Sequence, residues 1–178
     1  MKASNIFKFF CIFSLILVTF SLLSCQQGIT SQDEVKTARA GSSVMAPDFT
    51  LPDIDGKPFS MSSTKGKVVI LDFWSIGCDP CKDEIPHFVE LHKKYKGQGL
   101  EIIGMCLDTG AERYVKSFLQ SKGAEYPVVF ADREVVVKYG GVQYIPTTFI
   151  IDREGRITEK FVGYRSKEFF ESRIKELL

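Results

Sequence analysis

This sequence lacks several features that are typical of nucleic-acid-binding, repeat or membrane-spanning proteins. Its 23 lysines and arginines nearly balance 22 aspartates and glutamates, the net charge is +1, and no basic block stands out. We therefore expect no nucleic-acid partner. No internal repeat or low-complexity run occurs. The apolar run at residues 9–23 is shorter than the ~18 residues that a membrane span needs.

Cysteine is also scarce, with five residues in a chain of 178. A protein that is held together by disulfides would be shorter and denser in cysteine, so that class is excluded. Hydrophobic residues make up 44% of the chain and charged residues 25%, which is normal for a globular protein that buries a core. The length suits one ordinary domain and a targeting segment.

Residues 1–24 are predicted to be a signal peptide of the bacterial lipoprotein type. Lys2 and Lys8 precede the apolar run, and residues 22–25 (Leu-Leu-Ser-Cys) follow it and resemble a lipobox. On this interpretation Cys25 is lipidated and becomes the mature N-terminus, while Cys11 is removed with the peptide. An ordinary signal peptide, or a short membrane anchor with an incidental cysteine, remains the alternative.

Residues 25–43 are predicted to be the lipidated cysteine and a flexible tether, because they are polar, small and without periodicity. Residues 44–178 would then form the folded domain. Two acyl chains give a stable anchor, whereas a single chain is marginal. We therefore expect a membrane-anchored lipoprotein outside the cytoplasm, on the periplasmic side or the outer cell surface.

Strand and helix signals alternate through the domain, which is typical of an α/β sheet with covered faces. Pro86 is expected to kink the first helix. Residues 133–139 are predicted to form a short helix, although their three consecutive valines favour a strand. The predicted strands span residues 67–74, 100–107, 127–130, 147–152 and 156–162, and the predicted helices span residues 81–95, 111–122, 133–139 and 167–178.

The strongest chemical signal is Cys78-Asp79-Pro80-Cys81, which follows a predicted strand and opens a predicted helix. This spacing places Cys78 just before the first helical turn and Cys81 inside it, so the two sulfurs can approach within disulfide distance. Unpaired N–H groups and the helix dipole at the helix tip favour the thiolate of Cys78, which is the reactive species. The motif therefore predicts a redox-active pair.

A structural zinc site and a purely structural disulfide are the alternatives for this motif. Zinc would need a second ligand pair, and the remaining candidates, Cys106, His87 and His92, do not have ligand spacing. A disulfide across so tight a loop restrains little chain entropy. We interpret Cys106 as a small buried hydrophobe and the histidines as packed or solvated side chains. No metal or cofactor is expected.

Taken together, these features resemble the thioredoxin superfamily and, within it, the membrane-tethered TlpA/ResA-like branch. The resemblance covers residues 44–178. It is carried by residues 48–51 (Asp-Phe-Thr-Leu), 71–74 (Leu-Asp-Phe-Trp), the C-x-x-C motif with Pro86, and 141–148 (Gly-Val-Gln-Tyr-Ile-Pro-Thr-Thr). It implies a thioredoxin-like α/β fold, with a central mixed β-sheet flanked by helices, and thiol-disulfide oxidoreductase activity.

The resemblance also implies a substrate-binding surface beside the cysteines. Pro146 matches the family's cis-proline, and Ile145 before it would offer backbone hydrogen bonds to an extended substrate. Trp74 is assigned to the same surface. Gly77 departs from the family, whose members usually carry tryptophan there, so a flat apolar wall beside Cys78 is missing.

Two carboxylates are candidates for proton transfer with Cys81. Asp72 matches the buried acid of ordinary thioredoxins, and Glu84 matches an acid typical of ResA-type proteins. Either could relay a proton to or from the inner cysteine. The alternatives are a surface position at the strand end for Asp72 and a solvated helix charge for Glu84.

The acidic residues Asp79, Asp83 and Glu84 place negative charge near Cys78, which disfavours its thiolate and predicts a reductase of protein disulfides. The family resemblance implies a membrane thiol-reductase as electron donor and apocytochrome c cysteines as targets, and thus a role in cytochrome c maturation.

Two other functions stay open. A peroxiredoxin-like thiol peroxidase would share residues 48–51, but Leu71 stands where that family has proline. A copper carrier of the Sco type would use a wider cysteine spacing and a distal histidine, and His92 is the last histidine of this chain.

Overall fold

The computed structural model describes residues 44–178. The predictions for residues 1–24 and 25–43, including the lipidation of Cys25 and the removal of Cys11, lie outside the described residues. Within residues 44–178, no helix combines the length and the apolar character needed to cross a membrane.

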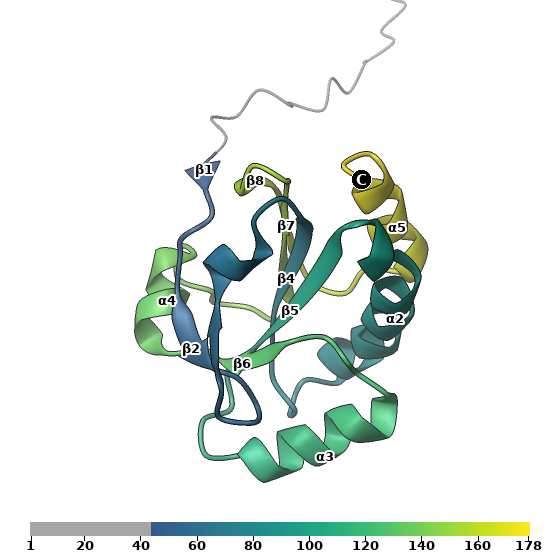
Figure 1. Ribbon diagram of the computed structural model, residues 1–178. Helices are drawn as coiled ribbons and strands as arrows, with labels where there is room; N and C mark the ends of the chain where they lie inside the picture. The colour runs from purple at the N-terminus through teal and green to yellow at the C-terminus, as the bar shows by residue number, and fades with distance from the viewer. Residues whose placement is uncertain (1–43) are drawn as a thin grey trace, which may run out of the picture. The chain divides into compact units, whose positions relative to one another are not determined.

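Six strands form one mixed sheet in the order β1-β8-β7-β4-β5-β6 (Figure 1). They are β1 (Val44–Met45), β4 (Val68–Trp74), β5 (Leu100–Cys106), β6 (Val128–Phe130), β7 (Thr147–Ile151) and β8 (Arg156–Val162). A separate two-stranded sheet consists of β2 (Thr50–Pro52) and β3 (Pro58–Ser60). β4 pairs in parallel with β5 and antiparallel with β7. The predicted central mixed sheet is confirmed.

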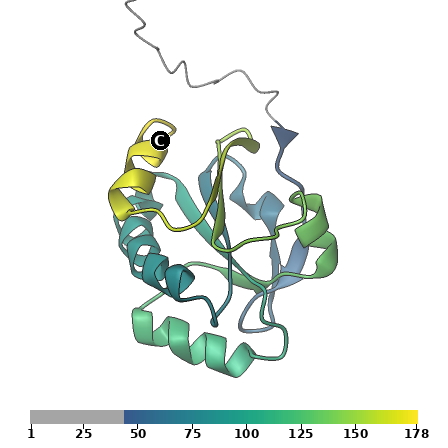
Figure 2. The same cartoon turned by 180° about the vertical axis from the view of Figure 1, so that it is seen from behind.

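Helices cover both faces of this sheet. The helices are α2 (Asp79–Tyr95), α3 (Glu112–Lys122), α4 (Arg133–Lys138) and α5 (Lys167–Lys175), with short 3-10 helices η1 (Met61–Thr64) and η2 (Lys96–Gln98). Figures 1 and 2 show α2 and α5 on one face and α4, with the small sheet, on the other. The valine run in α4 does not prevent a helix, because Asp132 caps it by accepting a 2.8 Å bond from the Val135 N–H.

Two of the predicted helix boundaries were wrong by more than one residue. α2 begins at Asp79, two residues earlier than expected, since proline is well tolerated in the first turn of a helix. Pro86 lies inside α2 as predicted. α5 ends at Lys175 rather than at Leu178.

The core has two parts because the side chains of β4 alternate between the two faces of the sheet. Val68, Ile70 and Trp74 pack into the cluster under α2 and α5. The intervening apolar residues pack on the opposite face with α4 and the small sheet. Every residue of β4 is buried, Asp72 included. The same alternation places Asp72 on the α2 face, which is the side that carries the cysteines.

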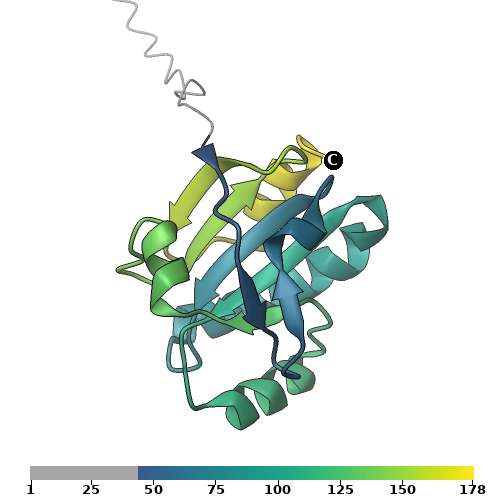
Figure 3. The ribbon, with the colours of Figure 1, turned by 60° about the vertical axis from the view of Figure 1, so that its left-hand side comes forward.

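β7 and β8 form an antiparallel hairpin that lies beside β4 in the sheet (Figure 3). Thr147 at the start of β7 pairs with Phe73, near the carboxyl end of β4, and Ile151 pairs with Val69. Pro146 therefore lies near the carboxyl end of β4, where the chain continues into α2. Asp152, in the hairpin turn, lies near the opposite end of β4.

Candidate active site

The two cysteines of the C-x-x-C motif are joined in a disulfide at the tip of α2, as their spacing predicts. Cys78 is the N-cap residue of the helix, and its sulfur accepts a 3.2 Å hydrogen bond from the Cys81 N–H. The Cα atoms lie 5.3 Å apart. Cys78 is half-buried, whereas Cys81 is fully buried. Only the outer sulfur is therefore placed to meet a macromolecular partner.

The peptide bond between Ile145 and Pro146 is cis, which agrees with the motif resemblance. The Ile145 carbonyl oxygen lies 3.9 Å from the Cys78 sulfur. The Pro146 carbonyl accepts a 2.8 Å bond from the Gly163 N–H, which ties this loop to the end of β8. Segments that are about seventy positions apart in the chain thus meet at one sulfur atom.

Asp72 is buried, so the alternative of a surface position at the strand end is wrong. Its side chain is only 2% exposed, and its Oδ1 accepts a 3.0 Å hydrogen bond from the Thr148 hydroxyl. Burial raises the pKa of Asp72 to about 7, against the opposing effect of the Thr148 hydrogen bond. Asp72 is therefore partly protonated near neutral pH.

Glu84 is also buried, and the alternative of a solvated charge is wrong as well. Its Oε1 accepts a 2.5 Å bond from the Arg165 N–H, while Oε2 has no hydrogen-bond partner among residues 44–178. Burial raises the pKa of Glu84 to about 8, and the nearby charge of Asp72 adds to this effect. Three positions separate Glu84 from Cys81, so both lie on the sheet-facing side of α2.

This burial corrects one premise of the sequence interpretation, the negative charge around Cys78. With its raised pKa, Glu84 is mostly protonated at pH 7. Asp79 forms a 2.6 Å ion pair with Lys82, whose charge opposes that of the carboxylate. Asp83 is exposed to solvent. The field at the outer cysteine is therefore less negative than the three acidic residues indicated.

The burial or exposure of the remaining residues near the motif agrees with their residue types. Trp74 is 1% exposed and packs against Phe118 with 6.2 Å between ring centroids, so its predicted contact with substrate stays a prediction. Gly77 is exposed, and a Cβ there would lie 3.7 Å from Ser75 Oγ, an ordinary contact. Burial raises the pKa of the Cys106 thiol to about 12, which agrees with its interpretation as an inert core residue.

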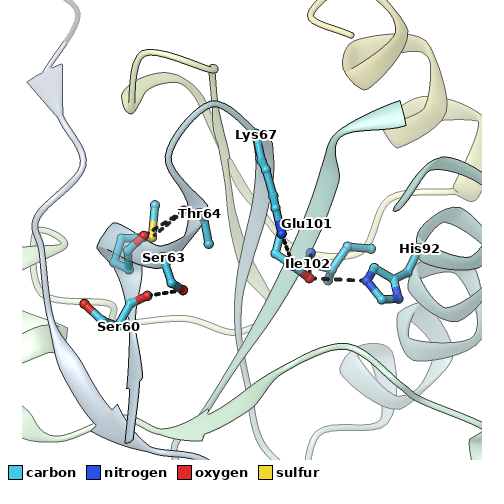
Figure 4. A network of polar contacts seen from close by, with 8 residues as sticks. Ser60, Ser63, Thr64, Lys67, His92, Glu101 and Ile102 are labelled. Carbon is cyan, nitrogen blue, oxygen red and sulfur yellow. Dashed lines mark hydrogen bonds and ion pairs between the residues drawn. The ribbon is translucent and has the colours of Figure 1, made fainter. Parts of the chain in front are cut away.

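The histidines pack, as expected. His92 Nε2 lies 3.2 Å from Glu101, which also holds Lys67 at 2.8 Å (Figure 4). Burial alone would raise the pKa of Glu101, but the hydrogen bonds from His92 and Lys67 lower it. The His87 ring lies 5.8 Å from that of Tyr164. The described part of the chain contains no group of three or more His, Cys, Asp or Glu side chains placed to hold a metal ion.

Sequence reasoning missed Asp108, which contacts the loop that leads into Cys78. Its carboxylate accepts hydrogen bonds from the Ser75 hydroxyl at 2.9 Å and from the Ile76 N–H at 2.6 Å. Its position just after β5 was the available signal, because the carboxyl ends of parallel strands meet at one edge and commonly carry functional residues.

The profile of the AhpC/TSA family matches residues 43–160 of this chain. The chain belongs to the AhpC/TSA family of thioredoxin-like proteins. This AhpC/TSA-family protein is 37% identical over 146 residues to the thiol-disulfide oxidoreductase ResA of Bacillus subtilis (strain 168), with 80% of each chain covered. It is 36% identical over 132 residues to ResA of Bacillus thuringiensis (strain Al Hakam), covering 74% of this chain and 76% of that one.

A solved structure leads to the same group of proteins. The crystal structure of a thioredoxin-family thiol:disulfide interchange protein from Chlorobium tepidum TLS matches with a TM-score of 0.72 and 34% identity, over 77% of this chain and 97% of the other. The predicted thioredoxin-like fold and the predicted family are thus confirmed. The protein is a thiol-disulfide oxidoreductase.

Proposed function

We propose that the protein reduces disulfides in other proteins outside the cytoplasm, by cycling Cys78 and Cys81 between dithiol and disulfide. The observation that carries this proposal is the asymmetry of the pair: Cys78 is half-buried at the tip of α2, and Cys81, to which it is bonded, is fully buried. Such an arrangement lets a partner's sulfur reach one cysteine and keeps the other for the second step.

The exchange has two steps. The Cys78 thiolate attacks one sulfur of the target disulfide, a mixed disulfide forms, and the other target sulfur leaves as a thiolate that takes up a proton. The Cys81 thiolate then attacks the Cys78 sulfur, and the second target sulfur leaves and is protonated. The target gains two electrons and two protons, and the protein is left in its disulfide form. An external dithiol must then supply two electrons to restore it.

Glu84 and Asp72 are assigned the proton transfer that the second step requires. Cys81 must lose its proton before it attacks, and it is buried away from water. A carboxyl with a pKa near neutrality exchanges protons efficiently at physiological pH. Glu84 is the closer candidate along the chain, because it lies one helical turn from Cys81. Its Oε2 has no hydrogen-bond partner among the described residues. Asp72 supports it from β4.

The surface around Cys78 suits a protein client. The Ile145 carbonyl borders the sulfur, and three exposed large apolar side chains lie at the same end of the sheet: Tyr144 (70% exposed), Val162 (47%) and Tyr164 (44%). We assign Ile145 the backbone contact to an extended client segment. Trp74, being buried, would support this surface from below.

The location and the partners follow from the sequence and from the family. A lipid anchor at Cys25 and the tether up to residue 43 would hold the domain beside a membrane. A membrane thiol-reductase would supply electrons, and apocytochrome c cysteines are the proposed clients. The reductase direction rests on the family, since the negative field first inferred around Cys78 is weaker than expected.

The test is a trapping experiment with Cys81→Ala and Cys78→Ala. The first variant should accumulate a mixed disulfide through Cys78 with a disulfide-bearing protein, and the second should form none. The reduced wild-type protein should release thiols from the same target. If it instead consumed peroxide rapidly without touching protein disulfides, or bound copper stoichiometrically without cycling, the peroxidase or the copper carrier would replace this proposal.

A further inference from the structure

Asp108 lies outside the motif, yet it contacts the loop that delivers Cys78 to the tip of α2. Its Oδ1 accepts a 2.9 Å hydrogen bond from the Ser75 hydroxyl, and its Oδ2 accepts a 2.6 Å bond from the Ile76 N–H. Asp108 comes from the segment after β5, and the loop comes from the neighbouring parallel strand β4. The carboxylate therefore bridges two strand ends.

The backbone of this loop depends on that bridge. The Gly77 N–H donates to Ser75 Oγ at 3.2 Å, and the Cys78 N–H donates to the Ser75 carbonyl at 3.1 Å. The N–H groups of residues 76–78 thus all have acceptors on Asp108 or on Ser75. Asp108 in turn accepts a hydrogen bond from the Ser75 hydroxyl. A backbone donor that loses its acceptor costs about 1–3 kcal/mol unless it finds another, so losing the carboxylate favours a different loop conformation.

The Asp108 carboxylate lies next to the paired ends of β4 and β5. The Leu107 N–H donates to the Trp74 carbonyl at 2.9 Å and extends the pairing of β4 with β5 up to the loop. The buried Cys106 sulfur lies 3.5 Å from Asp108 Oδ2. The loop, in contrast, contains the exposed Gly77, and glycine has the largest backbone freedom to lose on ordering. Asp108 therefore connects this loop to the ordered end of β5.

We propose that Asp108 is a positioning residue for the disulfide exchange. It holds residues 75–77 in the conformation that keeps Cys78 at the N-cap of α2 and beside the Ile145 carbonyl. The inference rests on the proposed function, because the sulfur must be presented to an incoming disulfide. Misplacing a reacting group by ~1 Å can slow a reaction about 100-fold, so a loop contact remote from the sulfur can control the rate.

The experiment compares three variants of the full chain: Asp108→Ala, Asp108→Asn and Asp152→Ala. Asparagine removes the charge but keeps an oxygen that can accept from the Ile76 N–H. Asp152 is the matched control, since its Oδ1 accepts from the Glu154 and Arg156 N–H groups at 3.0 and 2.8 Å, at the opposite edge of the sheet. The rate constant for reducing a protein disulfide is measured from pH 5 to 10, together with each melting temperature.

Asp108→Ala should lower the high-pH limiting rate constant by at least ~10-fold. Asp108→Asn should keep a rate constant within ~3-fold of the wild-type value. Asp152→Ala should lose stability, but its rate constant should stay within ~2-fold of the wild-type value. The inference is overturned if folded Asp108→Ala keeps the wild-type rate, or if Asp152→Ala slows the reaction equally. It is also overturned if Asp108→Asn is as slow as Asp108→Ala, since charge rather than position would then be responsible.

A second measurement separates this inference from the proposed function. Alkylation of reduced Cys78 by iodoacetamide against pH reports the thiolate without any client. Because asparagine removes the same charge, the Cys78 pKa in Asp108→Ala should exceed that in Asp108→Asn, as the sulfur loses the N–H groups of α2. Equal values would count against the positioning role. A wild-type protein that reduces no disulfide would contradict the proposed function instead.

Discussion

The carboxyl groups of Asp72 and Glu84, one from β4 and one from α2, are buried close enough that the charge of Asp72 raises the pKa of Glu84. Both groups titrate near neutrality, with pKa values of about 7 and about 8. In such a pair the observed protonation steps belong to the two groups jointly. These two buried carboxyls therefore gain and lose protons near neutral pH.

Glu84→Gln should slow the exchange. The amide keeps the shape of the side chain and an oxygen for the Arg165 N–H, but it cannot transfer a proton. We expect the rate constant for target reduction at pH 7 to fall by about 10²-fold, the lower end of the usual contribution of acid–base catalysis. Stopped-flow measurement of target reduction would show it.

Glu90→Gln is the control for that variant, because Glu90 lies on the same helix but pairs with Lys167 at the surface, 2.6 Å away. It should leave the rate unchanged. Equal rates for Glu84→Gln and wild type would remove Glu84 from the mechanism and leave Asp72 as the proton acceptor.

Stability should fall as the pH rises from about 5 to 8. Both carboxyls have native pKa values above their ordinary values of 3.8 and 4.5, so in this window the folded state binds more protons than the unfolded state. Their contribution is complete below pH ~4 and is lost as the pH passes the native values. Each tenfold difference in proton affinity between the folded and unfolded states corresponds to about 1.4 kcal/mol. Urea unfolding of the oxidised protein at pH 5 and pH 8 measures this difference.

The double variant Asp72→Asn, Glu84→Gln identifies the source of that dependence, because amides do not titrate. Its unfolding free energy should change less between the two pH values than that of the wild type. A wild-type dependence that survives unchanged in the double variant would assign the effect to other groups.

Gly77→Trp should be tolerated and should strengthen client binding. Gly77 is not among the glycines with positive φ, and a Cβ there makes only an ordinary contact with Ser75. A tryptophan at this exposed position would add the flat apolar wall that the sequence lacks beside Cys78. We expect the KM for a protein disulfide to fall by at least ~3-fold with little change in melting temperature.

Gly77→Ala serves as the control for the backbone, and it should bind clients like the wild type. A Gly77→Trp protein that folds but shows an unchanged or higher KM would mean that clients do not pass over this position.

Cys106 should resist modification in the folded protein. It is fully buried, and burial raises its pKa to about 12, so almost no thiolate exists at pH 8. Iodoacetamide treatment of the reduced native protein, followed by mass spectrometry, should label Cys78 first. Cys106 should react only after unfolding. Labelling of both at similar rates under native conditions would show that this part of β5 opens readily.

Local patterns in the sequence determined the elements and the central chemistry of this protein. A buried strand, the C-x-x-C spacing and the helix that follows are enough to place two sulfurs together, because all the atoms involved lie within a few residues. The helix boundaries were less accurate, since capping and fraying depend on contacts that the pattern does not contain.

Tertiary structure alone decided how the surroundings act on those sulfurs. The sequence left Asp72 and Glu84 between a buried and a solvated position, and folding buried both and set their protonation. Asp108 meets Ser75 across 33 positions of the chain, and Thr148 meets Asp72 across 76. Desolvation and long-range hydrogen bonds exist only once the chain is packed. The sequence by itself therefore determined which sulfurs pair, whereas the packed fold decided the protonation of the two buried carboxyls and the hydrogen bonds that hold the loop before Cys78.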